Sequence, residues 1–219
     1  MNQTVRQQQA LALVEQAPMI PVITISNLQT AVPLAKALRD GGLKVLEITL
    51  RTPEGLAAIR KIKAEVSDVM VGAGTVLNAT DYDNALAAGS DFLVSPGVTP
   101  QLLEVFQGSP VPILPGIATV GELMACLECG FDVLKFFPAE ANGGVKALRA
   151  IAGPFPQIKF CPTGGISMTN LPDYLVLPSV LTVGGSWLCS EALLQEGDWL
   201  AIRNLAAEAC AAVAAIEPR

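Results

Sequence analysis

The chain has 219 residues, of which 51% are apolar and 16% are charged, and its 14 basic and 20 acidic side chains give a formal net charge of −6. This composition excludes a disordered chain, and the acidic balance argues against nucleic acid as a partner. Histidine is absent, which excludes histidine-containing catalytic triads, HExxH zinc sites and histidine general bases.

The first 18 residues predict a short helix. They lack the basic stretch and apolar core of a secretory signal, so we expect no export. No run of about 18 apolar residues occurs anywhere in the chain, and we expect no membrane span. The apolar side of this helix is predicted to consist of Val5, Leu11, Leu13 and Val14.

Eight short apolar runs follow, each starting 20 to 25 residues after the one before it. Their length and β-branched content predict buried strands. The runs are PVITI (21–25), VLEITL (45–50), MVGAGTV (70–76), FLVSPG (92–97), PILPGI (112–117), VLKFFP (133–138), IKFCPTGG (158–165) and VLTVGGS (180–186).

Segments rich in Ala and Leu lie between these runs and have helical periodicity, as in residues 30–42, 53–66, 81–90 and 120–130. Several of them end at a glycine, as helices often do, at Gly42, Gly89 and Gly130. Strands that alternate with helices predict a parallel sheet, and eight regular units favour a (β/α)₈ TIM barrel. We therefore expect one domain over residues 1–219, with the helix of residues 1–18 capping the barrel.

Five cysteines, an odd number scattered through a chain of this size, predict reduced thiols and a cytoplasmic protein. Cys126 and Cys129 have the spacing of redox and zinc motifs. They lie within a predicted helix, and the chain offers neither a second CxxC nor a histidine to complete a site. We interpret them as partly buried helix residues.

Charged residues are rare within the predicted strands. Parallel strands are buried on both faces, so a charged side chain there needs an explanation. The alternation of side chains along a strand places Glu47 and Arg51 on one face of the second strand, and Lys135 and Phe137 on one face of the sixth. We predict that this face is the barrel interior.

Active sites of these barrels lie at the carboxyl ends of the strands. Thr75, Pro96 and Thr163 lie toward those ends, whereas Lys159 begins its strand and is assigned a structural role. A purely structural ion pair of Glu47 and Lys135 is the alternative. Buried pairs are weak evidence for stability, and the nearby charge of Arg51 favours a functional interpretation.

Paired glycines follow the seventh and eighth strands, at Gly164-Gly165 after Thr163 and at Gly184-Gly185 before Ser186. Glycine lets backbone N–H groups approach an anion closely. Because the loops after strands seven and eight form the recurrent phosphate site of TIM barrels, these glycines predict a phosphate-binding end.

A buried lysine that faces a cleft suggests carbonyl chemistry through a Schiff base, which requires the neutral amine that burial favours. Glu47, the only carboxylate inside the predicted strands, is the candidate for proton transfer, and Arg51 fits a fork-like grip on a substrate carboxylate. We expect neither a metal nor a cofactor. Two alternatives stay open, namely a phosphate-binding barrel without catalysis and a sugar-phosphate isomerase or epimerase.

Seven segments of the chain resemble the 2-keto-3-deoxy-6-phosphogluconate (KDPG) aldolases, many of which also act on 4-hydroxy-2-oxoglutarate (KHG). The resemblance covers about residues 21–198, with no departure at a motif position. The segments are EITLRT (47–52), GAGTV (72–76), SPG (95–97), PGI (115–117), FFPAEANGG (136–144), CPTGGI (161–166) and GGSW (184–187).

The resemblance implies a metal-independent class I aldolase of the Entner–Doudoroff route, with no cofactor, a phosphorylated keto acid as substrate and a homotrimeric assembly. It implies that Lys135 forms the Schiff base and that Glu47 transfers protons. It also implies a set of substrate-binding residues: Arg51 and Thr75 for the carboxylate, Pro96 and Phe137 for the pyruvyl group, Thr163 near the hydroxyls, and Gly164, Gly165, Gly185 and Ser186 for the phosphate.

Overall fold

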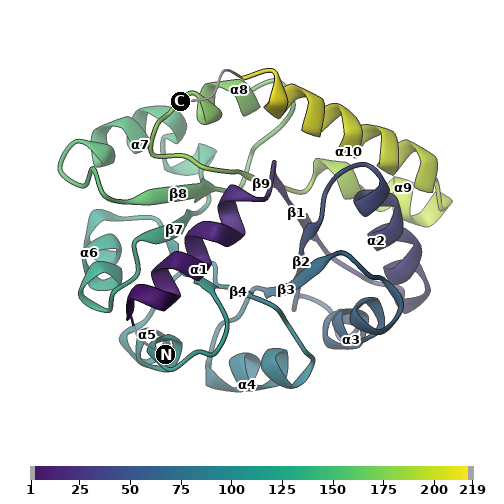
Figure 1. Cartoon of the computed structure of the whole chain (residues 1–219), viewed down its shortest axis with the longest axis horizontal. Helices are drawn as coiled ribbons and strands as arrows, with labels where there is room; N and C mark the ends of the chain where they lie inside the picture. Colours follow the sequence, from purple (N-terminus) through teal and green to yellow (C-terminus); the bar gives the residue numbers. More distant parts are fainter. Residues whose placement is uncertain (1–2, 217–219) are drawn as a thin grey trace.

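The computed structural model describes residues 3–216, so the first two residues of the predicted N-terminal helix and the last three residues of the chain lie outside it. Strands and helices alternate along the chain, and every strand pairing in the described part is parallel (Figure 1). The predicted parallel α/β architecture is therefore confirmed. The strands are β1 (Ile20–Ile23), β2 (Val45–Thr49), β3 (Met70–Gly74), β4 (Leu93–Val94), β5 (Ile113–Leu114), β6 (Gly116–Ile117), β7 (Val133–Phe136), β8 (Lys159–Pro162) and β9 (Gly184–Gly185).

Helices surround the strands on the outside (Figure 1). The glycines predicted to end three of them, Gly42, Gly89 and Gly130, have φ values of 99°, 86° and 82°, the left-handed conformation that glycine tolerates best. Within residues 3–216, no helix is long and apolar enough to cross a membrane. The α-helices are α1 (Gln3–Glu15), α2 (Ala31–Asp40), α3 (Gly55–Glu65), α4 (Ala79–Ala87), α5 (Pro100–Gln107), α6 (Val120–Glu128), α7 (Gly144–Ala152), α8 (Leu171–Leu175), α9 (Glu191–Glu196) and α10 (Trp199–Ala214).

The hydrogen bonds define two sheets, one of six strands in the order β5-β4-β3-β2-β1-β9 and one of three in the order β6-β7-β8. The fifth predicted strand is split between them at Pro115, which has no N–H to donate. The eighth predicted strand forms only β9, preceded by a single bridge between Phe160 and Val180. The predicted count of eight regular strands thus differs from the pattern observed, which is one of shorter, interrupted strands.

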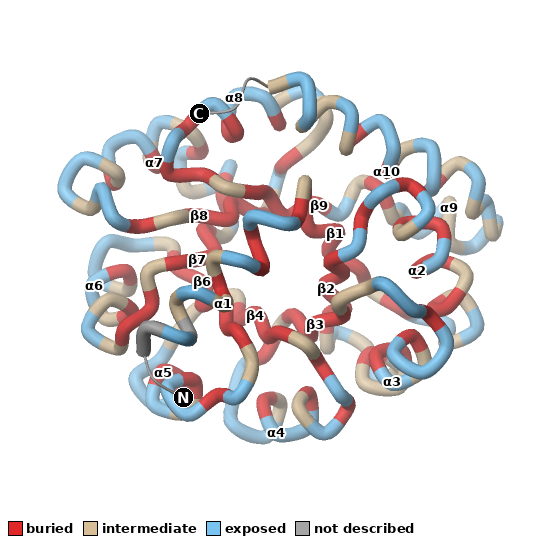
Figure 2. The backbone as a smooth tube through the Cα atoms, in the orientation of Figure 1, coloured by how far each residue is buried: buried red, intermediate tan, exposed pale blue. Residues whose placement is uncertain are grey.

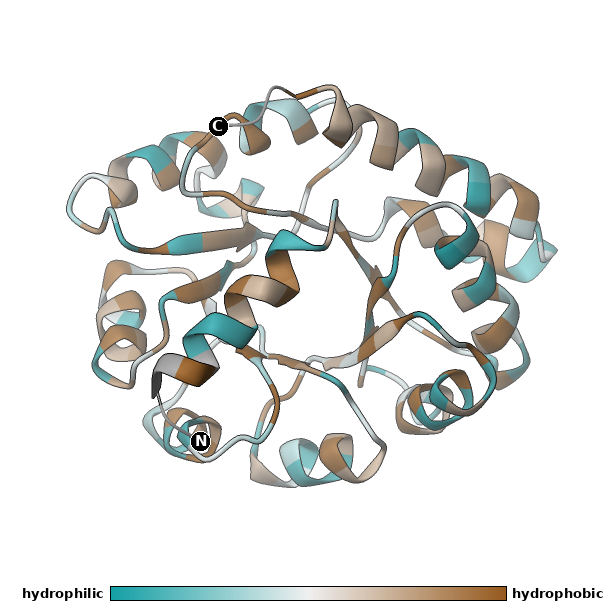
Figure 3. Cartoon of the chain, viewed as in Figure 1, coloured by the Kyte–Doolittle hydropathy of each residue, from teal (hydrophilic) through white to brown (hydrophobic). Residues whose placement is uncertain are grey.

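Apolar side chains fill the layer between helices and strands. Figure 2 shows the strands as buried and the outward faces of the helices as exposed, and Figure 3 shows hydrophobic residues on helix faces that turn toward the strands. The core includes Leu46 and Ile48, the outward-facing residues of β2. Their burial confirms the predicted alternation of this strand.

A second apolar cluster lies inside the ring of strands, where α1 crosses it (Figure 1). Leu13 and Val14 of α1 pack against Val45, Val133 and Cys161, which point inward from β2, β7 and β8. Leu11 is half-buried against the same cluster, so the predicted apolar side of this helix is correct at Leu11, Leu13 and Val14. The prediction was wrong at one position, because Val5 is 40% exposed and lies far along the helix from this contact.

Cysteines are free thiols at all five positions. Cys126 is buried in α6, and Cys129, half-buried, follows the last residue of that helix. Burial, with a smaller contribution from Cys129, raises the pKa of the Cys126 thiol to about 12. A thiol that stays protonated is a poor nucleophile, which agrees with the interpretation of Cys126 as a helix residue, whereas Cys129 lies one residue beyond the helix.

Candidate active site

The side chains inside the ring of strands form two successive layers, an apolar one next to α1 and a charged one beyond it. Val45 and Val133 belong to the apolar layer next to α1, and the next inward positions toward the carboxyl ends of β2 and β7 are Glu47 and Lys135. Lys135 Nζ lies 3.2 Å from Glu47 Oε1, and each side chain is only 4% exposed. The two charges predicted from separate strands are therefore a direct, buried pair.

The carboxylate of Glu47 lies against the backbone of β3. A Cβ atom at Gly74 would come within 2.6 Å of Glu47 Cγ, so only glycine leaves room for this side chain. Thr49, the next inward residue of β2, exchanges a 3.0 Å hydrogen bond with Thr24. Contacts with the neighbouring strands thus fix the position of the Glu47 side chain along the barrel axis.

Phe137 and Pro96 lie at the carboxyl ends of β7 and β4, as predicted. The centroid of the half-buried Phe137 ring is 5.3 Å from Lys135 Nζ, within the range of a cation–π contact. The backbone of Pro96 runs directly against Gly116, whose N–H donates to Ser95 Oγ at 3.2 Å. An aromatic face and a rigid backbone turn therefore border the same end of the strands.

Arg51 and Thr75 also come together. Arg51 follows the end of β2 and is exposed, and its Nε donates to Thr75 Oγ1 over 3.2 Å. Thr75 has a φ of 64°, which is rare for a β-branched residue. Such outliers concentrate at functional sites, because the surrounding structure must hold them in place.

The two glycine pairs lie on neighbouring chain segments, since Thr163 forms a parallel bridge with Gly184. Gly164 and Gly165 have φ values of 99° and 79°, so this turn requires glycine at both positions. Ser186 is exposed and immediately precedes a 3₁₀ turn (Trp187–Cys189). The residues predicted to bind a phosphate therefore lie together on one side of the rim, the ring that the carboxyl ends of the strands form.

Lys159 lies at the amino-terminal end of β8, and its Nζ donates to the carbonyl oxygen of Pro178 at 3.0 Å. This contact agrees with its predicted structural role. Among residues 3–216, no group of three or more Cys, Asp or Glu residues is placed to hold a metal ion.

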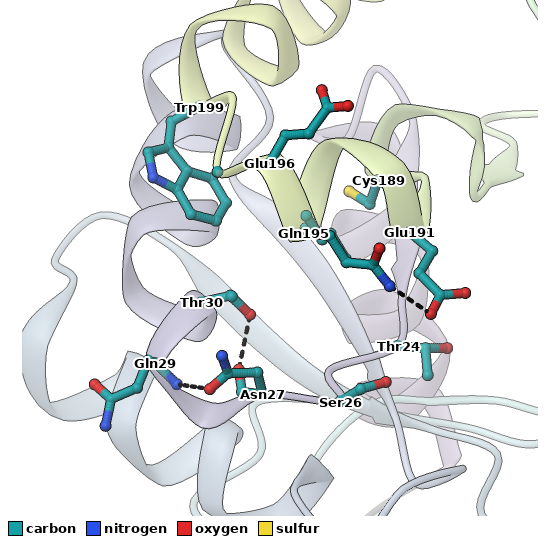
Figure 4. A pocket seen from close by; sticks show the side chains of 12 residues that line it. Thr24, Ser26, Asn27, Gln29, Thr30, Cys189, Glu191, Gln195, Glu196 and Trp199 are labelled. Atoms are coloured by element: carbon teal, nitrogen blue, oxygen red, sulfur yellow. Dashed lines mark hydrogen bonds between the residues drawn. The ribbon is translucent and has the colours of Figure 1, made fainter.

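A cavity of about 610 Å³ lies beside this rim, between the segment after β1 and helix α9 (Figure 4). Glu196 and Trp199 border one side, and Thr24 and Ser26 the other. None of the described residues that line it was predicted from the sequence to bind substrate. Cys189, which ends the turn that follows Ser186, is one of the residues that line the cavity.

The structure also brings together residues that the sequence analysis did not assign. The hydroxyl of Tyr174, in α8, donates to Glu140 Oε1, close to Gly165. Glu140 belongs to the FFPAEANGG motif, which was the only available signal for it. Tyr174 has no such signal, because its contact with Glu140 spans 34 residues.

A buried amine beside a carboxylate, toward the carboxyl ends of parallel strands, is the arrangement found in the class of enzymes that bond covalently to carbonyl substrates through lysine. The model of the family "KDPG and KHG aldolase" matches residues 11–205. The chain therefore belongs to the KDPG and KHG aldolase family, and it is a carbon–carbon lyase.

Relatives of this family match over most of their length. The chain is 55% identical to the 2-dehydro-3-deoxy-phosphogluconate aldolase of Dickeya dadantii, over 90% of this chain and 93% of that protein. It is 52% identical to the KHG/KDPG aldolase of Escherichia coli, over 91% and 94%. A crystal structure of KDPG aldolase from Legionella pneumophila, with pyruvate captured as a covalent carbinolamine intermediate, has a TM-score of 0.90 and 46% identity, and covers 92% of this chain and 98% of that one.

Proposed function

We propose that this aldolase cleaves KDPG to pyruvate and glyceraldehyde 3-phosphate, and KHG to pyruvate and glyoxylate, by a class I Schiff-base reaction that uses no metal. The observation that carries the proposal is the buried contact between Lys135 and Glu47. The covalent pyruvate adduct of the Legionella relative supports it. The first of these cleavages is a step of the Entner–Doudoroff route.

The reaction begins when the neutral Nζ of Lys135 attacks the keto carbon of the substrate, and a proton moves from the nitrogen to the oxygen to give a carbinolamine. A proton taken up from solvent water lets the carbinolamine hydroxyl leave as water, and the iminium that remains acts as an electron sink; the same proton is released when the last iminium is hydrolysed. The Phe137 ring and the backbone at Pro96 are proposed to hold the pyruvyl part beside the amine. Arg51 and Thr75 are proposed to bind the carboxylate, since a guanidinium matches its two oxygens.

Glu47 then accepts the proton of the hydroxyl two carbons from the iminium carbon. The bond between the carbon that carries this hydroxyl and the carbon next to the iminium carbon breaks, its electron pair passes to the iminium to form an enamine, and the aldehyde leaves. Glu47 returns the proton to the enamine carbon, and hydrolysis of the resulting imine frees pyruvate and Lys135. Every atom and charge is accounted for by these two residues and water.

The other end of the substrate is proposed to lie at the glycine pairs. Thr163 would contact a hydroxyl group, and the backbone of Gly164, Gly165 and Gly185 together with Ser186 would bind the phosphate. Backbone N–H groups of glycine turns are effective donors to phosphate oxygens. The bridge between Thr163 and Gly184 supports this assignment, because it puts both turns at one end of the rim.

We further infer that the two sheets act as one closed eight-stranded barrel in a single domain over residues 1–219. The bridges Phe160–Val180 and Thr163–Gly184 support closure between β8 and β9, and the bond from Lys135 N to Pro115 O, 2.9 Å long, supports closure across the break between β5 and β6. The free thiols support a reducing compartment, the cytoplasm.

A homotrimer is the assembly that we propose. Val120 and Met124, one turn apart on α6, are 43% and 50% exposed, which is consistent with a surface that pairs with another copy. We expect sedimentation equilibrium to give three times the mass of one 22.8 kDa chain. A mass of one or two chains at micromolar concentration would contradict this proposal.

Borohydride reduction in the presence of pyruvate tests the proposed chemistry. Reduction of the imine fixes pyruvate on the lysine, and we expect peptide mass mapping to find the adduct on the peptide that contains Lys135 and on no other. A binding protein without catalysis, or an isomerase, would give no adduct. Absence of an adduct at saturating pyruvate would therefore rule out the aldolase mechanism.

A further inference from the structure

Hydrogen bonds from the segment that follows β7 hold the glycine turn after β8 in place. Thr163 O accepts from Ala139 N at 2.8 Å, and Gly164 O accepts from Glu140 N at 3.1 Å. Gly165 O accepts from the side-chain amide of Asn170 at 3.0 Å. The N–H of Thr163 is bonded to Phe136 O at 2.9 Å, so the donors that we assign to an anion at this turn are the N–H groups of its glycines.

The side chain of Glu140 also touches this turn. A Cβ atom at Gly165 would lie 2.6 Å from Glu140 Cγ, so the stem of Glu140 packs directly on the Gly165 backbone. A displacement of Glu140 would therefore move the turn, both through its N–H bond to Gly164 and through this contact. Glu140 itself is exposed and needs a restraint to stay in one position.

Tyr174 supplies that restraint. Its ring is completely buried in α8, and its hydroxyl donates to Glu140 Oε1. Gly144, at the start of α7, leaves room for the pair, because a Cβ atom there would lie 2.9 Å from both Glu140 Oε1 and the Tyr174 hydroxyl. Burial, followed by the bond to Glu140, raises the pKa of Tyr174, so the hydroxyl stays protonated and remains the donor.

We propose that Glu140 and Tyr174 are positioning residues that set the shape of the Thr163–Gly165 turn and thereby the enzyme's preference for phosphorylated substrates. The bond to Tyr174 has a second effect, since it directs a carboxylate toward α8 and away from an anion on the turn. Without it, the free carboxylate would repel phosphate. This inference rests on the proposed function, because it concerns the substrate of the same site.

The test compares Tyr174→Phe with the unsubstituted enzyme on KDPG and on KHG, which carries no phosphate. We expect the KM for KDPG to rise about tenfold, the effect of losing a hydrogen bond to a charged group, while kcat and both constants for KHG change less than about twofold. Ser186→Ala is the comparison variant in the second turn and should show the same split. Tyr82→Phe, which alters a tyrosine packed on Phe106, is the matched control and should show no change.

Glu140→Gln keeps an acceptor for Tyr174 and removes the charge, so it should raise the KM for KDPG much less than Tyr174→Phe does. Equal losses on both substrates in Tyr174→Phe, or no loss on either, would overturn the inference. Borohydride trapping of pyruvate in every variant separates this failure from that of the proposed function. An adduct with no substrate split refutes only the positioning role, and absence of an adduct in the unsubstituted enzyme refutes both.

Discussion

Replacement of Lys135 by Met is expected to lower turnover by about 10⁴-fold or more, the scale of losing a covalent nucleophile. Methionine has nearly the same length and cannot form an imine. Assays of pyruvate release measure the loss, and borohydride with pyruvate should label no peptide. Lys159→Met is the matched control, because Lys159 lies at the opposite end of the neighbouring strand and bonds only to a backbone carbonyl.

Stability separates chemistry from structure in this variant. Lys135→Met leaves Glu47 buried without its partner, which we expect to cost about 3–5 kcal/mol in the free energy of unfolding. The double variant Lys135→Met with Glu47→Leu replaces the pair by apolar side chains and should recover most of that stability while staying inactive. Restored activity in the double variant would show that the pair has only a structural role.

Replacement of Glu47 by Gln is expected to separate imine formation from turnover. The amide keeps an oxygen next to Lys135 but cannot accept the substrate proton, so kcat should fall by about 10²–10⁴-fold. Borohydride trapping of pyruvate should still label Lys135. Proton NMR in D₂O gives a direct measurement, because exchange of the pyruvate methyl protons requires Glu47 and should slow to a similar extent.

Glu208→Gln, which changes an exposed carboxylate on α10, is the control for this experiment. Normal turnover or normal methyl exchange in Glu47→Gln would remove Glu47 from the proton-transfer role. Loss of trapping would indicate that Glu47 is needed to form the imine.

The charged pair was predictable because strand geometry leaves few choices. Side chains alternate along β2 and β7, and parallel strands start from the same end, so Glu47 and Lys135 had to reach similar depths in the interior. The ends of several helices were predictable for a related reason. Glycine is favoured where the chain takes a positive φ, as at Gly42 and Gly89.

Features that depend on tertiary contact were not predictable. The break at Pro115 depends on whether a neighbouring strand accepts a hydrogen bond at the position where proline has no N–H, and the sequence does not show which neighbour that is. The apolar run 180–186 likewise does not show that only Gly184–Gly185 would pair regularly. The contact of Tyr174 with Glu140 joins two elements far apart in sequence. The cavity near Trp199 depends on how α9 packs, which no periodicity encodes.

Helix α1 affects the order in which products leave the site and substrates enter it. Its side chains Leu13 and Val14 seal the amino-terminal end of the strand ring with an apolar floor, so substrate and products share one entrance. In the proposed mechanism, the keto acid bonded to Lys135 lies deepest, and the aldehyde lies between it and bulk water. The aldehyde must therefore depart before pyruvate can, and in the synthetic direction pyruvate must arrive first.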